Sequence, residues 1–218
     1  MIIKMYWKNT LKRLASMQEY KYYYEGASFY CYPDSAILIN KYDIKNEDLL
    51  NQAERKLTEL KAVELVNNPV KGNFDFKHFC DIHKFLFEDI YEWAGQKRKG
   101  GFMSKGSTVF AKSEFIESSF NEYYERLVKD NFLKSLDKDA FCKSLAYYMS
   151  EINKIHPFRE GNGRTAKIYF EQLAENAGYD LDFSMIDKDE LILADVLSYR
   201  GNYALSIEIL NQAVTPLL

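Results

Sequence analysis

One stretch restricts the possible folds of this chain more than any other. In residues 138–155 the apolar positions are spaced alternately by four and three, which is the period of an amphipathic helix. They are Phe141, Leu145, Tyr148, Ile152 and Ile155. The same type of spacing predicts further helices at about 46–67, 75–95, 113–130, 164–177, 187–198 and 203–213. We interpret all of these apolar stripes as core-packing faces, so the chain is predicted to be nearly all-α.

The helical pattern is interrupted at residues 100–112, "GGFMSKGSTVFAK". Glycines in mid-run and the alternation in "STVF" favour a short β-hairpin or an ordered loop. The first 30 residues have no clear period, and the tyrosines at 22–24 are expected to lie in a partly buried loop. We therefore predict an N-terminal extension over 1–30 and a single domain over 31–218.

Two of the predicted helices carry specific expectations. In the helix at 46–67, one face is predicted to be buried through Leu50, Ala53, Leu57 and Leu60. The helix that begins at residue 75 is expected to reach Gly95, which is a plausible C-cap.

Composition excludes several classes of protein. The formal net charge is −3, whereas a nucleic-acid binder usually shows a strongly basic face. The three cysteines are far apart and show neither a disulfide framework nor zinc spacing. His78 and His83, five residues apart, do not share a helix face and are not expected to bind a metal together. With no apolar run long enough for a signal peptide or a membrane span, the sequence predicts a soluble cytoplasmic protein.

The strongest helix runs directly into "HPFREGNGRTAK", residues 156–167. Pro157 cannot continue the helix, so His156 is expected at its C-terminus. Gly161 and Gly163 allow positive φ and close backbone approach, and Arg164 is expected to open the next helix. A loop that ends at a helix N-terminus is an anion site, most often for phosphate, because the first amides lack intrahelical partners.

The side chains of this stretch suggest phosphate chemistry. Arg164 and Lys167 lie on one face of the second helix and could bind a chain of phosphates. Glu160 can hold Mg²⁺ together with substrate phosphates, and His156 can act as a base near neutral pH. Together they predict a nucleoside triphosphate site at which a hydroxyl attacks phosphorus.

Other interpretations of this stretch fit its residues less well. "GNGRTA" fits the loose dinucleotide fingerprint, but that motif requires a preceding strand, and here a helix and His-Pro precede it. No Walker-type G-x-x-x-x-G-K-[ST] run occurs in the chain. A purely structural role, as a glycine-rich connector with a capping histidine, is disfavoured by the full ordered set of residues.

The stretch resembles the signature of the Fic family, H-x-F-x-[DE]-G-N-G-R-x-x-R. The matching residues are His156, Phe158, Glu160, Gly161, Asn162, Gly163 and Arg164. The similarity, to small bacterial Fic toxins, extends over about residues 30–213. It implies an all-α Fic-type helical bundle with one small β-hairpin flap. It also implies transfer of AMP from ATP, with Mg²⁺, to a Tyr, Ser or Thr hydroxyl of a target protein.

The resemblance also implies roles for individual residues. His156 would be the catalytic general base, and Glu160 would hold Mg²⁺. The ATP-binding residues would be Glu160, Gly161, Asn162, Gly163, Arg164 and Lys167. The flap, about 102–112, would dock an extended target segment by strand addition. Its docking residues would be Ser107, Thr108, Val109 and Phe110.

The sequence departs from the family pattern in ways that bear on activity and regulation. Lys167 stands where the family has Arg, which keeps the charge but loses the bidentate fork. No [S/T]-x-x-x-E-[G/N] inhibitory helix is found; the nearest stretch, "KYYYEG" with Glu25, is interpreted as a plain loop. We therefore expect the toxin of a toxin–antitoxin pair, inhibited by a small separate antitoxin that carries such a helix. The family suggests type II topoisomerase as its target. The alternatives are a phosphotransferase on the same fold and a catalytically weak regulatory module.

Overall fold

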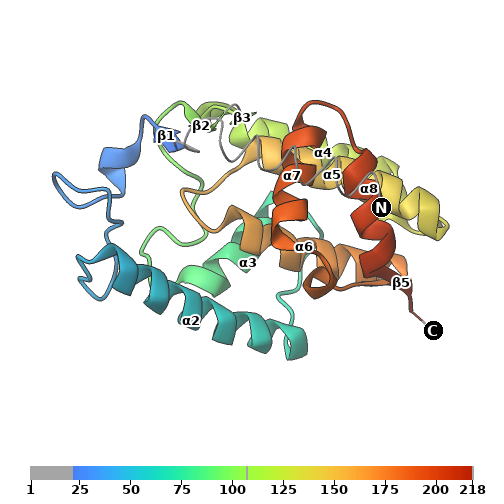
Figure 1. Cartoon of the computed structure of the whole chain (residues 1–218), viewed down its shortest axis with the longest axis horizontal. Coiled ribbons are helices and arrows are strands. Elements are labelled where there is room, and N and C mark those ends of the chain that lie inside the picture. Colours follow the sequence, from blue (N-terminus) through green and yellow to red (C-terminus); the bar gives the residue numbers. More distant parts are fainter. Residues whose placement is uncertain (1–21, 107, 218) are drawn as a thin grey trace.

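The computed structural model describes residues 22–106 and 108–217, which fold mainly into helices (Figure 1). The helices are α2 (Glu47–Asn67), α3 (Phe76–Phe87), α4 (Ile116–Lys129), α5 (Lys138–Ile155), α6 (Asn162–Ala177), α7 (Lys188–Tyr199) and α8 (Ala204–Ala213). The long central helix α5 contacts α4, α6, α7 and α8, while α3 lies between α2 and α6. The predicted all-α class, with a small hairpin, is confirmed. No helix of the described residues has the length and apolar character that a membrane span requires.

Most predicted helices occur close to their expected positions. Helix α5 begins after Asp137, whose side chain accepts a hydrogen bond of 2.9 Å from the Ala140 N–H, as expected of an N-cap. The prediction for the helix ending at Gly95 was wrong, because α3 ends at Phe87. Gly95 has positive φ but lies in the turns that follow α3.

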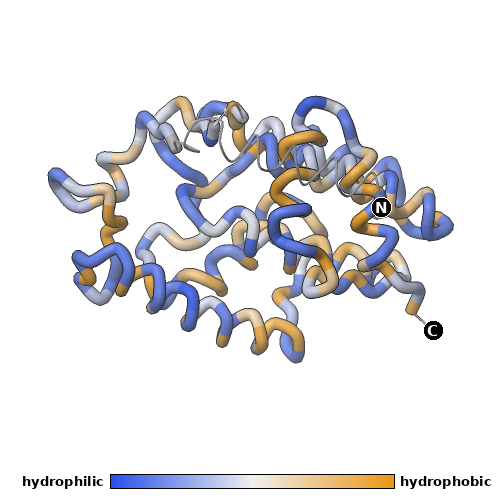
Figure 2. Tube along the Cα trace, in the orientation of Figure 1, coloured by the Kyte–Doolittle hydropathy of each residue, from blue (hydrophilic) through white to orange (hydrophobic). Residues whose placement is uncertain are grey.

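The buried face of α2 is unexpectedly polar. Leu50 is buried as predicted, but Leu60 is 69% exposed, and Glu54 and Thr58 are buried instead. Figure 2 shows hydrophilic colours along the first part of α2. The apolar spacing misled the prediction because this face of α2 contacts a charged residue of α6, Arg164.

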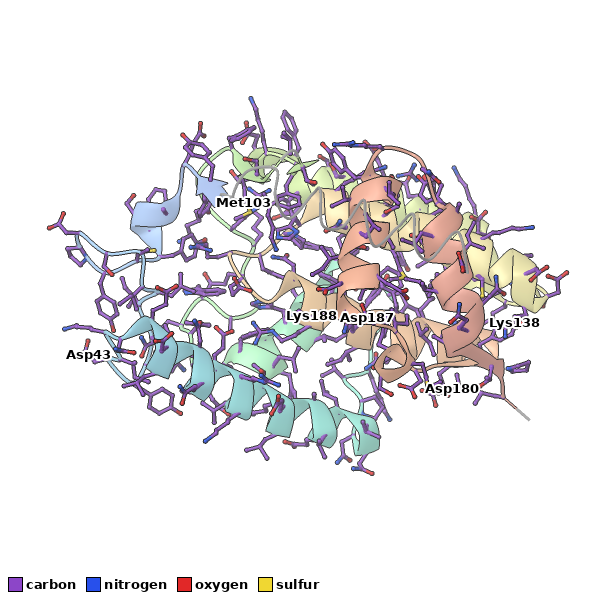
Figure 3. All side chains as sticks on the ribbon, in the orientation of Figure 1. Asp43, Met103, Lys138, Asp180, Asp187 and Lys188 are labelled. Carbon is purple, nitrogen blue, oxygen red and sulfur yellow. The ribbon has the colours of Figure 1, made fainter. Side chains whose placement is uncertain are left out.

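In the part of the chain that the structure describes, two small sheets accompany the helices. In the first, β1 (Tyr22–Tyr24), β2 (Met103–Lys105) and β3 (Thr108–Val109) lie side by side in that order and are antiparallel (Figure 1). In the second, β4 (Tyr179–Leu181) pairs with β5 (Val214–Pro216) and joins the C-terminal end of the described chain to the end of α6. Met103, the first residue of β2, is fully buried, whereas the side chains of Asp43 and Lys138 lie at the periphery (Figure 3).

Strand β1 corrects the expectation of a loop at 22–24. Its residues pair with β2, with Tyr23 opposite Ser104. Just after β1, the Glu25 N–H donates to the Phe102 carbonyl at 3.1 Å, and the Glu25 carboxylate accepts from the Phe102 N–H at 2.8 Å. Part of the expected N-terminal extension is thus joined to the flap. The remainder of the extension, residues 1–21, lies outside the described residues.

Candidate active site

His156 lies where α5 ends. It is the C-cap of that helix and adopts the left-handed conformation, with φ 46° and ψ 62°. Pro157 follows and prevents continuation of the helix. The imidazole stacks on the Phe110 ring of the flap at a centroid distance of 3.7 Å and lines a cavity of about 270 Å³. The structure therefore turns the candidate base toward a cavity at the helix end.

The surroundings of His156 keep its ring neutral. Burial lowers the pKa of His156 to about 3, and the positive charges of Arg98 and Lys105 act in the same direction. The Asn153 backbone acts weakly in the opposite direction. Among the described residues, none forms a hydrogen bond of normal geometry with the buried Nδ1. A neutral imidazole is the form that can accept a proton near neutral pH.

Arg98 fixes the backbone of His156, a role that the sequence analysis missed. Its side chain is almost fully buried. Its Nε donates to the His156 carbonyl at 2.9 Å, and its guanidinium also donates to the carbonyls of Gly101 and Ala111 in the flap. The Arg98 N–H donates to the Pro157 carbonyl at 2.8 Å. One side chain thus ties the turn at His156 to both ends of the flap.

The two glycines of the loop have different roles. Gly161 has φ +81°, and a Cβ at this position would lie 2.3 Å from the Phe87 ring, so both backbone and packing require glycine. Gly163 does not have a positive φ. The expectation that both glycines of the loop use this conformation therefore holds only for Gly161. A Cβ there would meet nothing within 4 Å, because the position faces open space. The first intrahelical bond of α6 runs from the Thr165 N–H to the Gly161 carbonyl, so the preceding amides have no intrahelical acceptor, as the predicted anion site requires.

Asn162 holds the loop closed. Its Oδ1 accepts from the Phe158 N–H at 2.8 Å, and its Nδ2 donates to the Phe158 carbonyl at 2.9 Å. Phe158 is fully buried, as expected for the anchor of the loop, and stacks on His83 and Phe79. Because the Asn162 side chain bonds to protein backbone, its direct contribution to an anion site is its own backbone N–H.

His83 holds the loop between α5 and α6 through the backbone of Glu160. Its buried ring accepts from the Gly95 N–H at Nδ1, 2.8 Å, so Nε2 carries the proton and donates to the Glu160 carbonyl at 3.0 Å. Burial lowers the pKa of His83 to about 3, so this neutral tautomer is stable near neutral pH. This role of His83 had no local sequence signal, because Glu160 is 77 residues away along the chain.

Arg164 joins the first turn of α6 to α2. Its guanidinium donates to the Glu54 carboxylate at 2.6 Å and to the Thr58 hydroxyl at 3.2 Å, and it lies over the Phe87 ring. The Tyr91 hydroxyl also donates to Glu54. The side chain of Arg164 remains 37% exposed. Glu54 and Thr58 were missed, because the apolar spacing of α2 pointed to other positions as its buried face.

The remaining charged residues surround the cavity. Glu160 lines it, with a half-exposed carboxylate that accepts from the Gly161 N–H at 2.9 Å. Asp195, from α7, also lines the cavity. Burial raises the pKa of Asp195 to about 7, while Lys105 and Lys167 oppose that shift. The Lys167 amine lies over the Phe183 ring, 5.4 Å from its centroid. Asp195 had no sequence signal, since it enters the site only through tertiary packing.

The flap contributes to the site as well. Thr108 and Phe110 are buried and line the cavity, whereas Val109 is 44% exposed. Ser107, the other residue expected to dock a target, lies outside the described residues. The structure thus brings His156, Glu160, Asn162 and Gly163 together on one cavity.

Comparison with known proteins gives consistent matches. The model of the Fic/DOC family matches residues 73–174. The protein adenylyltransferase VbhT of Bartonella schoenbuchensis is 36% identical over 193 residues, covering 88% of this chain but only 40% of that relative. The probable protein adenylyltransferase Fic of Escherichia coli is 38% identical over 166 residues, covering 76% of this chain and 81% of that relative.

A solved structure adds a match in three dimensions. The N-terminal Fic domain of a VirB-translocated Bep effector protein of Bartonella quintana, with bound ADP, superposes with a TM-score of 0.82. The identity is 29%, and the match covers 88% of this chain and 97% of the other. With a left-handed histidine, a glycine loop at the start of α6 and these relatives, the chain belongs to the Fic/DOC family.

Proposed function

We propose that this chain is a protein adenylyltransferase that transfers AMP from ATP to a Tyr, Ser or Thr hydroxyl of a target protein. The observation that carries the proposal is the placement of neutral His156 on the same cavity as Glu160 and the N-terminal end of α6. The names of the relatives and the ADP held by a structural neighbour support nucleotide chemistry.

In the proposed reaction, the target hydroxyl oxygen attacks the α-phosphorus of ATP. The bond from that phosphorus to the oxygen bridging to the β-phosphate breaks, and pyrophosphate leaves. His156 takes the hydroxyl proton: burial keeps the ring neutral, and a neutral imidazole has a ring nitrogen that can accept a proton. The amides at the start of α6 stabilise negative charge on the transferring group.

The residues present fit a magnesium ion. Mg²⁺ is commonly held by one or two carboxylates plus substrate phosphates, and the half-exposed carboxylate of Glu160 lies on the cavity. When bound, the ion would neutralise charge on the phosphates.

The phosphate-binding residues divide by what each can offer. Asn162 and Gly163 contribute backbone N–H groups, because the Asn162 side chain is bonded to Phe158. Arg164 acts from a position fixed by Glu54, and its part-exposed guanidinium supplies positive charge near the phosphates. Lys167 would offer the terminal phosphate a single point charge rather than a fork.

The proposal extends to regulation and partners. We propose a cytoplasmic toxin that is inhibited by a separate antitoxin carrying an [S/T]-x-x-x-E-[G/N] helix, with type II topoisomerase as the target suggested by family resemblance. Glu25, in the stretch nearest to the inhibitory motif, has its carboxylate bonded to the Phe102 N–H of the flap. Target segments would dock on the flap at Ser107–Phe110.

The test uses ATP labelled at either the α- or the γ-phosphate, with purified protein and a bacterial lysate. Label transferred only from the α-phosphate, and lost in His156→Ala, is the expected result. Transfer from the γ-phosphate would instead support the phosphotransferase alternative. If His156→Ala binds ATP as wild type does and neither protein transfers label, the chain is a binding module and the proposal fails.

A further inference from the structure

The backbone N–H and C=O groups of Val109 point away from the other strands of the flap. In the pairing of β2 with β3, Val109 lies opposite Ser104. The neighbouring Phe110 N–H donates to the Met103 carbonyl at 3.0 Å. Because inward and outward groups alternate along a strand, the N–H and C=O of Val109 point outward, at the edge that β2 does not cover. The opposite edge of the sheet is already occupied by β1.

A side chain, rather than a strand, satisfies these outward groups. The Val109 N–H donates to the hydroxyl of Tyr199 at 3.2 Å, and the same hydroxyl donates to the Val109 carbonyl at 2.9 Å. Two residues further on, the Ala111 N–H donates to the Lys154 carbonyl, and the Ala111 carbonyl accepts from Arg98. Within the described part of the flap edge, the backbone hydrogen bonds of Ala111 are thus made with α5 and Arg98. Those of Val109 depend on one side-chain hydroxyl.

A groove of about 510 Å³ runs beside this edge, with Val109 and Tyr199 among its lining residues. Its wall is charged and internally paired: Arg126 donates to Glu151 at 3.2 Å, and Lys154 donates to Glu151 at 2.8 Å. A chain lying in this groove would meet backbone groups on one side and charged side chains on the other. It would therefore suit an extended segment with polar side chains on the groove-facing side.

The same edge adjoins the cavity of His156. Thr108 and Phe110 line that cavity, and the Phe110 ring stacks on the imidazole. Phe110 lines the groove as well. A segment paired along β3 would pass beside the candidate base, and the alternation of its side chains would direct every second one toward the cavity.

We propose that Tyr199 is the gate of this docking edge: its hydroxyl holds the outward N–H and C=O of Val109 until an extended segment of the target protein replaces it. This inference rests on the proposed function. A docked backbone offers the same donor and acceptor that the hydroxyl provides. A segment must therefore compete with Tyr199, and one that pairs poorly is excluded. Tyr199 is accordingly a specificity-determining residue rather than a catalytic one.

The test replaces the hydroxyl alone, with Tyr199→Phe, and uses Tyr42→Phe as the matched control. Tyr42 is 53% exposed and lies outside both the groove and the cavity. The probe is a short fluorescent peptide of alternating threonine and valine with one central tyrosine. Its partner probe carries N-methyl groups on alternate backbone amides and cannot pair as a strand. Binding is followed by fluorescence anisotropy in the presence of a non-hydrolysable ATP analogue.

Removal of one neutral hydrogen-bonding competitor should tighten peptide binding about fivefold in Tyr199→Phe. Tyr42→Phe should bind as wild type does, and the N-methylated peptide should bind weakly to all three proteins. The amide of Val109 should also exchange its hydrogen faster in free Tyr199→Phe. Equal peptide affinity in wild type and Tyr199→Phe, no peptide binding by any protein, or equal binding of the two peptides would overturn the inference.

A second measurement separates this inference from the proposed function. Transfer from α-labelled ATP to the peptide tyrosine should show a KM for peptide lowered about fivefold in Tyr199→Phe, with kcat unchanged. If Tyr199→Phe binds the peptide more tightly but no label is transferred, the role of Tyr199 is supported and the proposed reaction is refuted. If label is transferred with the same KM in both proteins, the reaction stands and the gate fails.

Discussion

The contact between α2 and the loop helix α6 allows a quantitative prediction. In Glu54→Gln the shape of the side chain is kept but its charge is removed. Arg164 then loses the carboxylate that it contacts at 2.6 Å. The substitution also weakens the acceptor of the Tyr91 hydroxyl. The variant tests whether this ion pair holds the anion-binding end of α6 against α2.

The expected cost follows from the burial of the pair. A hydrogen bond to a charged group contributes about 1.5–3 kcal/mol, and removal of one partner of a fully buried ion pair costs about 3–5 kcal/mol. The Arg164 side chain is 37% exposed and the Glu54 side chain 11%, so water partly re-solvates the guanidinium. We therefore expect a loss of about 2 kcal/mol in the free energy of unfolding, or about 4–8 °C in Tm for a chain of this size.

The matched control is Glu59→Gln, the same chemical change on the same helix. Glu59 pairs with Arg55 at 2.9 Å, but both side chains are largely exposed, so the expected cost is below about 0.5 kcal/mol. Both variants are compared with wild type by thermal and urea denaturation. Equal losses for Glu54→Gln and Glu59→Gln would show that the contact with Arg164 does not stabilise the fold beyond a surface pair.

The remaining predictions concern the loop and the cavity. Gly161→Ala should destabilise the protein by about 2–4 kcal/mol in denaturation, because the new Cβ is strained at φ +81° and clashes with Phe87. Gly163→Ala should keep Tm at or slightly above wild type but weaken ATP binding in calorimetry, since its Cβ would project into open space beside the cavity. Lys167→Arg should lower the KM for ATP by restoring a fork; an unchanged KM and kcat would remove the idea that lysine weakens triphosphate binding. Asp195→Asn should raise Tm at pH 8 and not at pH 4. The folded pKa of about 7 lies above the unfolded value, so wild-type stability falls as pH rises between them; an equal effect at both pH values would contradict this.

The parts of the fold that depend on local pattern were predictable from sequence. The apolar period located α5 from Lys138 to Ile155, and Pro157 located its end. The residues of the loop between α5 and α6 are consecutive in the chain, so their closeness near the start of α6 could also be predicted from the sequence. Phe158 could be identified as the anchor because it is the apolar residue between His156 and the glycines.

The parts that depend on distant contacts were not predictable. The buried face of α2 includes Glu54 because Arg164, 110 residues later, approaches it, and no local period records such a pairing. Strand β1 is a run of three tyrosines without alternation in polarity, and only its partner β2 makes it a strand. The roles of His83 and Arg98 likewise arise from carbonyls far along the chain.

The double hydrogen bond between Asn162 and Phe158 has a consequence for how tightly the loop can bind a ligand. Fixing the backbone of one flexible residue costs about 1–2 kcal/mol of conformational entropy. Here the side chain of Asn162 and the buried ring of Phe158 fix the loop during folding. The backbone amides of the loop are therefore preorganised before a nucleotide binds, and little of the interaction energy is needed to order them. Even a fragment as small as inorganic pyrophosphate should therefore bind measurably on its own.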